Sequence, residues 1–267
     1  MAGAPGTGGL AGELAAAMAA VRSSPQAIEP RMALFQLACV VGQWDRARAQ
    51  LDTMAQLDAE LLLLSRIYGR LIDAEAMRRR VFAGSEQPVA LGEPPAWLAM
   101  MAQALQLDGR GEEAAARGLR QRGREDAAAR PGTIGTDAFA WIMDADPRLG
   151  PTLEVIVEGQ YRWLPLDALE ELRAEAPKAM RDLVWQPVAL RLAGGSELAA
   201  FVPTRYPGSE LEDDDAVRLA KETRWIEKDG EQWGFGQRLL ATDGGDQAFL
   251  DIRALRFGDD GATNRDA

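Results

Sequence analysis

The chain has 267 residues, which is long enough for one large domain or two ordinary ones. It contains no histidine, so a Ser-His-Asp triad, a Cys-His pair and a histidine-ligated zinc are excluded. The net charge is −11, and residues 131–267 carry all of it, because residues 1–130 contain 15 basic and 15 acidic side chains. Phosphate binding needs clustered cations, so nucleic acid is a poor partner, whereas a basic protein segment suits this charge.

The sequence predicts neither a membrane span nor a secretion signal. No apolar run approaches the roughly 20 residues of a membrane span, and the first residues lack the basic region of a signal peptide. The single cysteine, Cys39, stands on the apolar face of an expected helix, so no internal disulfide can form. These features fit a reducing compartment, and we expect a cytoplasmic protein.

The first half of the chain predicts helices, because it is rich in Ala, Leu, Met and Arg and poor in β-branched residues. We expect a helix that begins at residue 10 and ends before Pro25, a helical hairpin over 30–58, a longer helix over 59–84 and a second hairpin over 94–123. Gly42 should end the first helix of its hairpin, and Gly84 should close the long helix.

The spacing Gly42, Trp44, Ala47 and Leu51 matches the middle of a tetratricopeptide repeat, in which an aromatic and a small packing residue follow a helix-breaking glycine. The flanking positions of that signature are weak. Any antiparallel helix pair would show the same spacing, and both interpretations stay open.

From about residue 131 the pattern changes to short β-rich segments separated by turns. Lys-Asp-Gly at 228–230 and Asp-Gly-Gly at 243–245 predict two β-hairpin turns. Short helices are expected at 166–177 and 213–223. The predicted fold class is α+β, with a tetratricopeptide-like helical domain over 10–130 and an acidic, mainly antiparallel β domain with short helices over 131–257. Disorder is expected at 1–9 and 258–267.

The stretch "FAWIMDADPRLGP" at 139–151 offers the strongest chemical motif. Asp144 and Asp146 form the Asp-x-Asp pair that ligates a metal in sugar-nucleotide enzymes, and they follow an apolar run, as in those proteins. No strand–helix alternation and no glycine-rich phosphate loop accompany the pair. The favoured interpretation is therefore a turn, in which both carboxylates accept backbone N–H groups or pair with Arg148, and Trp141 packs inward. A metal-dependent enzyme using this pair is the alternative.

An acidic run and a proline-glycine turn in the second half are also interpreted as structural features. The acidic run at 210–215 precedes an apolar-periodic segment, as expected of a helix N-terminus, and it lacks the pattern of a calcium loop. "RYPG" predicts a type II turn, with Arg205 and Tyr206 beside it as candidate contact residues, since both types are common interface anchors. Large aromatic residues should supply burial in the β domain, and one or two of them could line a groove: Trp141, Tyr161, Trp163, Trp185 and Trp225.

Several blocks, in order and over roughly residues 10 to 257, resemble the ImpE/TagJ family of type VI secretion accessory proteins: "LFQLACVVGQWDRARAQLD", "LGEPPAWLAMMAQAL", "FAWIMDADPRLGPTLEVIVEGQYRWLP", "MRDLVWQPVALRL", "VPTRYPGSE" and "GFGQRLLATD". The resemblance implies a two-domain cytoplasmic protein without enzymatic activity, cofactor or metal. It further implies an adaptor that binds the contractile sheath through an N-terminal helix of the small sheath subunit, and that influences how the AAA+ recycling ATPase acts on the sheath. A general assembly scaffold with another partner is the remaining alternative.

Overall fold

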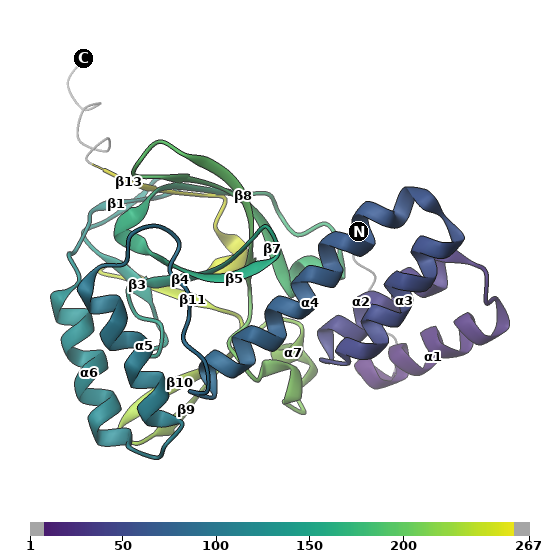
Figure 1. Cartoon of the computed structure of the whole chain (residues 1–267), viewed down its shortest axis with the longest axis horizontal. Helices are drawn as coiled ribbons and strands as arrows, with labels where there is room; N and C mark the ends of the chain where they lie inside the picture. The colour runs from purple at the N-terminus through teal and green to yellow at the C-terminus, as the bar shows by residue number, and fades with distance from the viewer. Residues whose placement is uncertain (1–7, 259–267) are drawn as a thin grey trace.

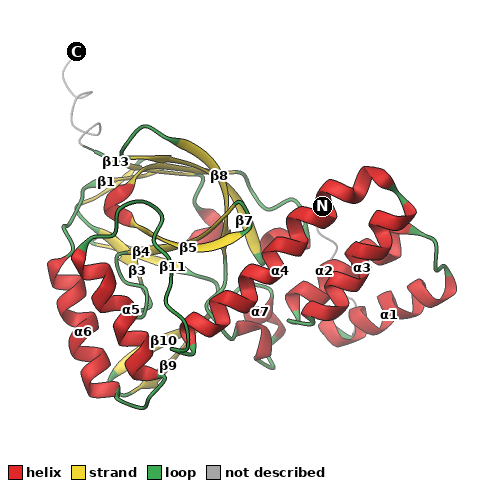
Figure 2. Cartoon of the chain, in the orientation of Figure 1, coloured by secondary structure: helices red, strands yellow, loops and turns green. Residues whose placement is uncertain are grey.

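The computed structural model describes residues 8–258, so the expected disorder of residues 1–7 and 259–267 lies outside the described chain. Gly9 already begins the first helix, which corrects the expectation that residues 8 and 9 are disordered. Six longer helices occupy the first half of the described chain (Figures 1 and 2): α1 (Gly9–Ser23), α2 (Ile28–Val40), α3 (Trp44–Leu57), α4 (Leu62–Phe82), α5 (Ala96–Asp108) and α6 (Glu113–Asp126).

Glycine ends three of these helices by the same device. At Gly42 the backbone takes φ +68°, the N–H of Gln43 donates to the carbonyl of Ala38 at 2.8 Å, and the N–H of Gly42 donates to Cys39 at 3.3 Å. This pair of bonds is the Schellman motif, which satisfies carbonyls that the helix leaves unpaired. Gly84 and Gly111 close α4 and α5 in the same way, so the predicted helix ends at Gly42 and Gly84 are confirmed.

The second half forms sheets in which every strand pairing is antiparallel within the described residues. The largest has eight strands in the order β2-β1-β13-β6-β7-β8-β4-β5, and two smaller sheets have the orders β12-β11-β3 and β10-β9. The strands are β1 (Gly132–Ile134), β2 (Asp137–Phe139), β3 (Ile142–Asp144), β4 (Thr152–Val157), β5 (Gln160–Pro165), β6 (Leu169–Ala174), β7 (Trp185–Leu192), β8 (Glu197–Pro203), β9 (Thr223–Lys228), β10 (Glu231–Gly236), β11 (Leu239–Thr242), β12 (Gly245–Ala248) and β13 (Ala254–Phe257). The α+β class is confirmed.

Short helical turns lie between the longer elements, one of them between α3 and α4 and the others among the strands. Single 3-10 turns lie at η1 (Ala59–Leu61), η2 (Leu166–Ala168), η3 (Met180–Leu183), η4 (Ser209–Leu211) and η5 (Phe249–Asp251), and one α-helical turn forms α7 (Asp215–Arg218). The Asp214 side chain accepts the N–H of Ala216 at 2.9 Å, so the acidic run does cap a helix N-terminus as expected. Both predicted hairpins are present, with Asp229 and Gly230 at positive φ between β9 and β10.

The helix expected over 166–177 is wrong, because this segment supplies β6, an inner strand of the large sheet. Leu169 and Leu172 are three residues apart and both fully buried, which is the spacing of a helix face. The pairing of β6 with β7 shifts register between Leu169 and Glu171. A β-bulge inserts one extra residue, so two residues three apart can share one face of a strand.

Two hydrophobic cores lie on opposite faces of the large sheet, because neighbouring strand residues such as Trp163 and Leu164 belong to different cores. One is made by the sheet strands themselves, including Leu164, Leu172 and Val202. The other runs from Leu10 in α1 to Leu219, and it contains residues of α2–α5 together with Trp163 of β5 and Trp185 of β7. Helix α4 runs from the group formed by α1, α2 and α3 to the sheet in Figure 1, and it packs on β5. The domain boundary near residue 130 stays a prediction.

Candidate functional site

The corner at 139–151 forms the turn that the sequence predicts. After β3, the Oδ1 atom of Asp144 accepts the N–H of Asp146 at 2.8 Å, and the Oδ1 atom of Asp146 accepts the N–H of Arg148 at 2.9 Å. The carbonyl of Asp146 also accepts the N–H groups of Leu149 and Gly150. Short Asp side chains that bond the backbone two residues ahead are typical of such turns, so both carboxylates organise the corner itself.

Asp146 and Arg148 also close one edge of the β9–β10 hairpin. The Oδ2 atom of Asp146 accepts the N–H of Gly234 at 2.9 Å, and the Nη2 atom of Arg148 donates to the carbonyl of the same glycine at 3.3 Å. Arg148 lies over the ring of Trp233, 4.5 Å from its centroid. Asp146 is fully buried. Together, Asp146 and Arg148 take the place of a neighbouring strand, because they satisfy the outward N–H and C=O of Gly234.

Asp144 faces a different cation. Its Oδ2 atom accepts from Nη1 of Arg238 at 2.6 Å, and its Oδ1 atom accepts the hydroxyl of Tyr206 at 3.0 Å. Burial raises the pKa of Asp144 to about 7, against the lowering effect of the Arg238 charge. Every oxygen of Asp144 therefore already has a donor from the protein.

Glu154 of β4 lies at the centre of the buried ionic network, which we define as Arg78, Asp144, Glu154 and Arg238. Its carboxylate accepts two bonds from Arg78 of α4, at 2.7 and 2.9 Å, and a further bond from Arg238. The hydroxyl of Tyr161 donates to it at 2.6 Å. Burial raises the pKa of Glu154, but the charges of Arg78 and Arg238 outweigh burial and hold the pKa at about 2. Glu154 is thus ionised and joins α4 to the sheet.

Arg205 and Tyr206 are buried, which corrects their assignment as candidate surface contacts. The Arg205 guanidinium donates to the carbonyl of Val40 at 2.7 Å and to that of Arg218, at the ends of α2 and α7. A cation at the carbonyl end of a helix satisfies unpaired groups and complements the helix dipole. Gly208 takes φ +88°, as the predicted type II turn requires, so the turn is confirmed and its two neighbours stabilise the fold.

The aromatic candidates divide into buried and half-buried residues. Tyr161 and Trp163 are buried and joined, since the Trp163 Nε1 donates to the Tyr161 hydroxyl at 2.7 Å. Trp225 is half-buried and packs on Tyr206, with ring centroids 5.6 Å apart. Trp141 is also half-buried and belongs to neither core, so the expectation that it packs inward is wrong. It follows the short strand β2 at the margin of the sheet, where one side faces solvent.

The Asp-x-Asp pair does not fit a metal site. Asp144 and Asp146 direct their oxygens at Arg238, Arg148 and backbone N–H groups, and a divalent cation would have to displace these donors. Across residues 8–258, no group of three or more Asp, Glu, Cys or His side chains has the arrangement to hold a metal ion. The geometry therefore favours the structural interpretation of the motif.

Sequence reasoning missed the three residues that bind the network together: Arg78, Glu154 and Arg238. Glu154 carried a usable signal, because it is a lone acid within the apolar run "TLEVIV", and a charge at an inward strand position must find a partner. Arg78 belongs to the run "RRR" and Arg238 to the β-rich stretch "GFGQRLLATD", so neither differs locally from a solvated residue.

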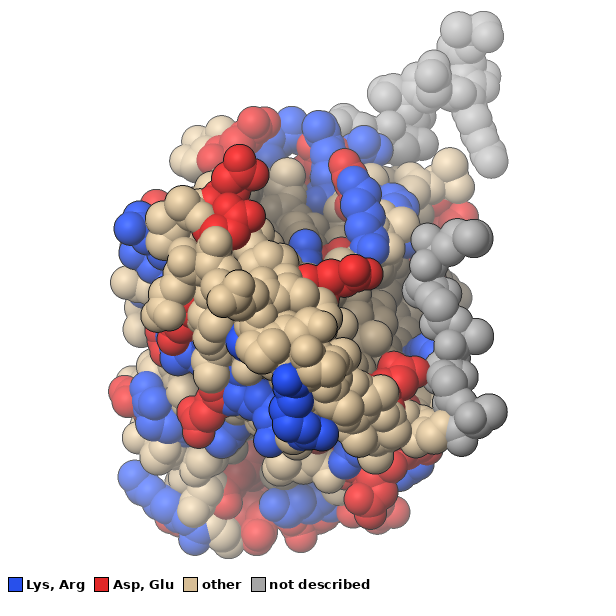
Figure 3. All heavy atoms as spheres, turned by 90° about the vertical axis from the view of Figure 1, so that its right-hand side faces the viewer, with Lys and Arg blue, Asp and Glu red and all other residues tan. Residues whose placement is uncertain are grey.

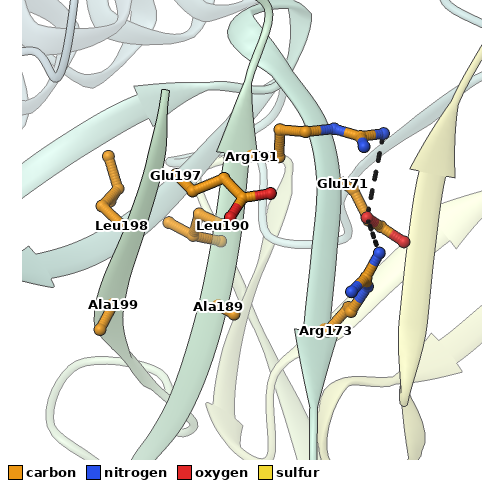
Figure 4. A pocket seen from close by; sticks show the side chains of 8 residues that line it. All are labelled: Glu171, Arg173, Ala189, Leu190, Arg191, Glu197, Leu198 and Ala199. Atoms are coloured by element: carbon orange, nitrogen blue, oxygen red, sulfur yellow. Dashed lines mark hydrogen bonds and ion pairs between the residues drawn. The ribbon is translucent and has the colours of Figure 1, made fainter. Parts of the chain in front are cut away.

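The outer face of β6, β7 and β8 carries a shallow hollow of about 300 Å³ (Figure 4). Glu171 forms ion pairs there with Arg173 at 2.6 Å and Arg191 at 3.9 Å, as the figure shows, and it also accepts from Arg256. Ala189 and Ala199 also line the hollow. Glu171 is thus neutralised by its arginine partners, and Glu197 at the margin of the hollow is exposed to solvent.

A more distinctive surface lies where α3 ends and α4 begins. Leu57, Leu62, Leu63 and Ile67 are large apolar side chains with exposed fractions of 42, 44, 67 and 36%. We name these four residues the helix-tip patch. Arg66 and Arg70 are exposed on the same part of α4. Figure 3 views the molecule from the end that carries these helices, and uncharged residues form a band across it with charged side chains along its margins.

None of the helices in residues 8–258 combines the length and apolarity that crossing a membrane requires. Exposed apolar clusters of this kind commonly mark interaction sites.

Comparison with known proteins gives the family. Residues 136–256 match the model of the ImpE protein family. Over 237 residues the chain is 48% identical to the type VI secretion system accessory component TagJ of Pseudomonas aeruginosa, and the match covers 89% of this chain and 83% of the relative. The chain belongs to the ImpE family. The predicted resemblance is thereby confirmed.

A solved structure agrees with the fold of this ImpE-family chain. The crystal structure of protein VPA1032 from Vibrio parahaemolyticus superposes with a TM-score of 0.83, over 93% of this chain and 94% of that one, at 23% identity. The likeness supports the observed arrangement of helices and sheets. At this identity it carries no information about ligands or partners.

Proposed function

We propose that this ImpE-family protein is a non-enzymatic accessory component of a type VI secretion system. Its similarity to the Pseudomonas aeruginosa accessory component supports this role. The absence of histidine from the sequence and the mutual neutralisation of the Asp144, Glu154 and Arg238 side chains support a role without catalysis. The protein acts in the cytoplasm, as its single buried cysteine suggests.

Within this role, the protein is an adaptor that binds an N-terminal helix of the small sheath subunit. The observation that carries this proposal is the helix-tip patch. Leu63 and Ile67 are four residues apart on α4 and therefore lie on one helix face, with Arg66 and Arg70 beside them. An amphipathic helix that buries its apolar stripe on such a face would remove these side chains from water.

A calorimetric titration with the N-terminal peptide of the cognate small sheath subunit tests the proposal. Burying a Leu side chain contributes roughly 1.5–3 kcal/mol, so Leu63→Asp should weaken binding by at least tenfold. The control Val89→Asp alters another exposed apolar side chain away from the patch and should bind as the parent does. If no heat is seen at about 100 μM peptide, sheath binding is refuted; if both variants bind equally, the patch is the wrong surface.

The adaptor also alters how the AAA+ recycling ATPase acts on the sheath. Sheath disassembly by the purified ATPase should change rate when this protein is added, and Leu63→Asp should abolish the change if sheath binding is responsible. An unchanged rate with saturating wild-type protein would refute the link to the ATPase. Recovery of another partner, without sheath subunits, in a pull-down from the native cell would instead favour a general scaffold.

A further inference from the structure

The two edges of the β9–β10 hairpin differ in how their backbone groups are satisfied. In an antiparallel pair, residues alternate between those bonded to the partner strand and those whose N–H and C=O point away from it. Gly234 and Gly236 of β10 point away, and both are satisfied. Gly234 bonds Asp146 and Arg148, while Gly236 receives the N–H of Tyr206 at 2.9 Å and donates to the hydroxyl of Ser209 at 2.8 Å. The β10 edge is therefore closed.

The outer edge of β9 is open. Thr223 and Trp225 lie opposite Gly236 and Gly234, so their N–H and C=O groups point away from β10, and those of Glu227 follow by the alternation of the strand. No described residue donates to or accepts from these backbone groups. Among the described elements only β10 packs extensively on β9, and β9 lies at the rim of the molecule in Figures 1 and 2. Such an edge is a template for another strand.

The side chains of this edge are half apolar and half charged. Ile226 is 41% exposed, and Trp225 is half-buried on the opposite face of the strand. Arg224 is already engaged, since it pairs with Asp214 at 2.8 Å and with Glu212 at 3.4 Å. Glu227 is exposed and has no ion pair with another described residue. The edge thus presents apolar contact and one free acid.

The surrounding charge decides what kind of strand fits. Residues 209–231 contain nine acidic and four basic side chains, a net charge of −5. A second copy of the chain would bring the same negative charge to the edge, and like charges in apposition disfavour the pairing. A segment with lysine or arginine would be attracted instead.

We propose that the outer edge of β9 binds an extended, basic segment of another protein as a third strand of the β9–β10 sheet. Main-chain bonds to Thr223, Trp225 and Glu227 supply affinity, while Ile226 and the acidic surroundings select apolar and basic side chains. This surface is separate from the helix-tip patch, so it adds a second binding mode to the adaptor role.

A synthetic seven-residue peptide of alternating lysine and valine serves as the probe, titrated into the full-length protein at low salt. Glu227→Pro removes one outward N–H while keeping every hairpin bond, since proline is tolerated at an edge strand. Glu227→Thr is the matched control that keeps the N–H and removes the charge. We expect saturable binding with a Kd below about 1 mM, a few-fold loss for Glu227→Thr and at least a tenfold loss for Glu227→Pro.

Equal affinity of the wild-type protein and a folded Glu227→Pro variant would overturn the proposal, as would the lack of saturable binding by the wild type. If Glu227→Pro unfolds, the same peptide with N-methylated alternate amides replaces it, and undiminished binding of that peptide would also overturn the proposal. Sedimentation that finds a dimer sensitive to Glu227→Pro would assign the edge to a second copy and refute the basic partner. Leu63→Asp should leave peptide binding unchanged, so a failure here is distinguishable from failure of the sheath proposal.

Discussion

Replacing Glu154 by glutamine tests whether the buried ionic network holds α4 against the sheet. The Glu154 carboxylate is fully buried and faces the guanidinium groups of Arg78 and Arg238. A neutral amide would leave both cations with less compensating charge, and its NH₂ group would oppose their donors. Breaking a buried ion pair by removing one partner costs about 3–5 kcal/mol, so the free energy of unfolding should fall by about that amount.

Chemical denaturation at neutral pH measures this loss, with Glu175→Gln as the control. Glu175 pairs with Lys178 at a site where both side chains are 76% exposed, and such solvated pairs add little to stability. For a chain of this size the buried change should lower the Tm by roughly 6–20 °C. Equal losses for the two variants would refute the anchoring of α4 by the buried ionic network.

Further predictions concern pH, thiol reactivity and packing. Burial raises the pKa of Asp144 to about 7 from 3.8, so the folded protein binds this proton more tightly than the unfolded chain. The free energy of unfolding should therefore fall as the pH rises between these values. In Asp144→Asn, the free energy of unfolding should change less with pH across that range, and an unchanged pH dependence would contradict the titration of Asp144. Burial also raises the pKa of the Cys39 thiol, so a thiol reagent should label Cys39 in denaturant but not in the native protein, and rapid native labelling would contradict its burial. A methyl group at Gly234 would clash with the ring of Tyr206, so Gly234→Ala should lower the Tm. The control Gly194→Ala places its methyl group in open space and should cause no steric loss of stability. Equal Tm values for the two variants would contradict the close packing at Gly234.

The candidate site was predictable in part because its turn is local. Asp144, Asp146 and Arg148 are close in sequence, so the spacing predicted which side chains and N–H groups would meet. The cations that complete the site were not predictable in this way. Arg78 and Glu154 are 76 positions apart, and Arg238 is 84 positions from Glu154. Nothing local distinguishes a buried arginine from a solvated one until the fold brings its partner to it.

The same distinction explains two of the incorrect structural predictions. The Leu169–Leu172 spacing has a helical period, and the bulge against β7 made that spacing compatible with a strand. Arg205 and Tyr206 have the composition of interface anchors, yet both are buried against the ends of two helices and the β9–β10 hairpin. Exposure depends on what packs over a residue, which local sequence does not specify.

By itself, the sequence determined the helices and their glycine stops, the two hairpin turns, the acidic second half and membership of the ImpE family. These features depend on local periodicity, on backbone conformations that glycine adopts easily, and on the order of whole sequence blocks. Only the tertiary structure decided the pairing of β6, the buried ionic network, the helix-tip patch and the open edge of β9. Each of these depends on which distant segments cover one another, since burial and strand pairing are contacts between residues far apart in the chain.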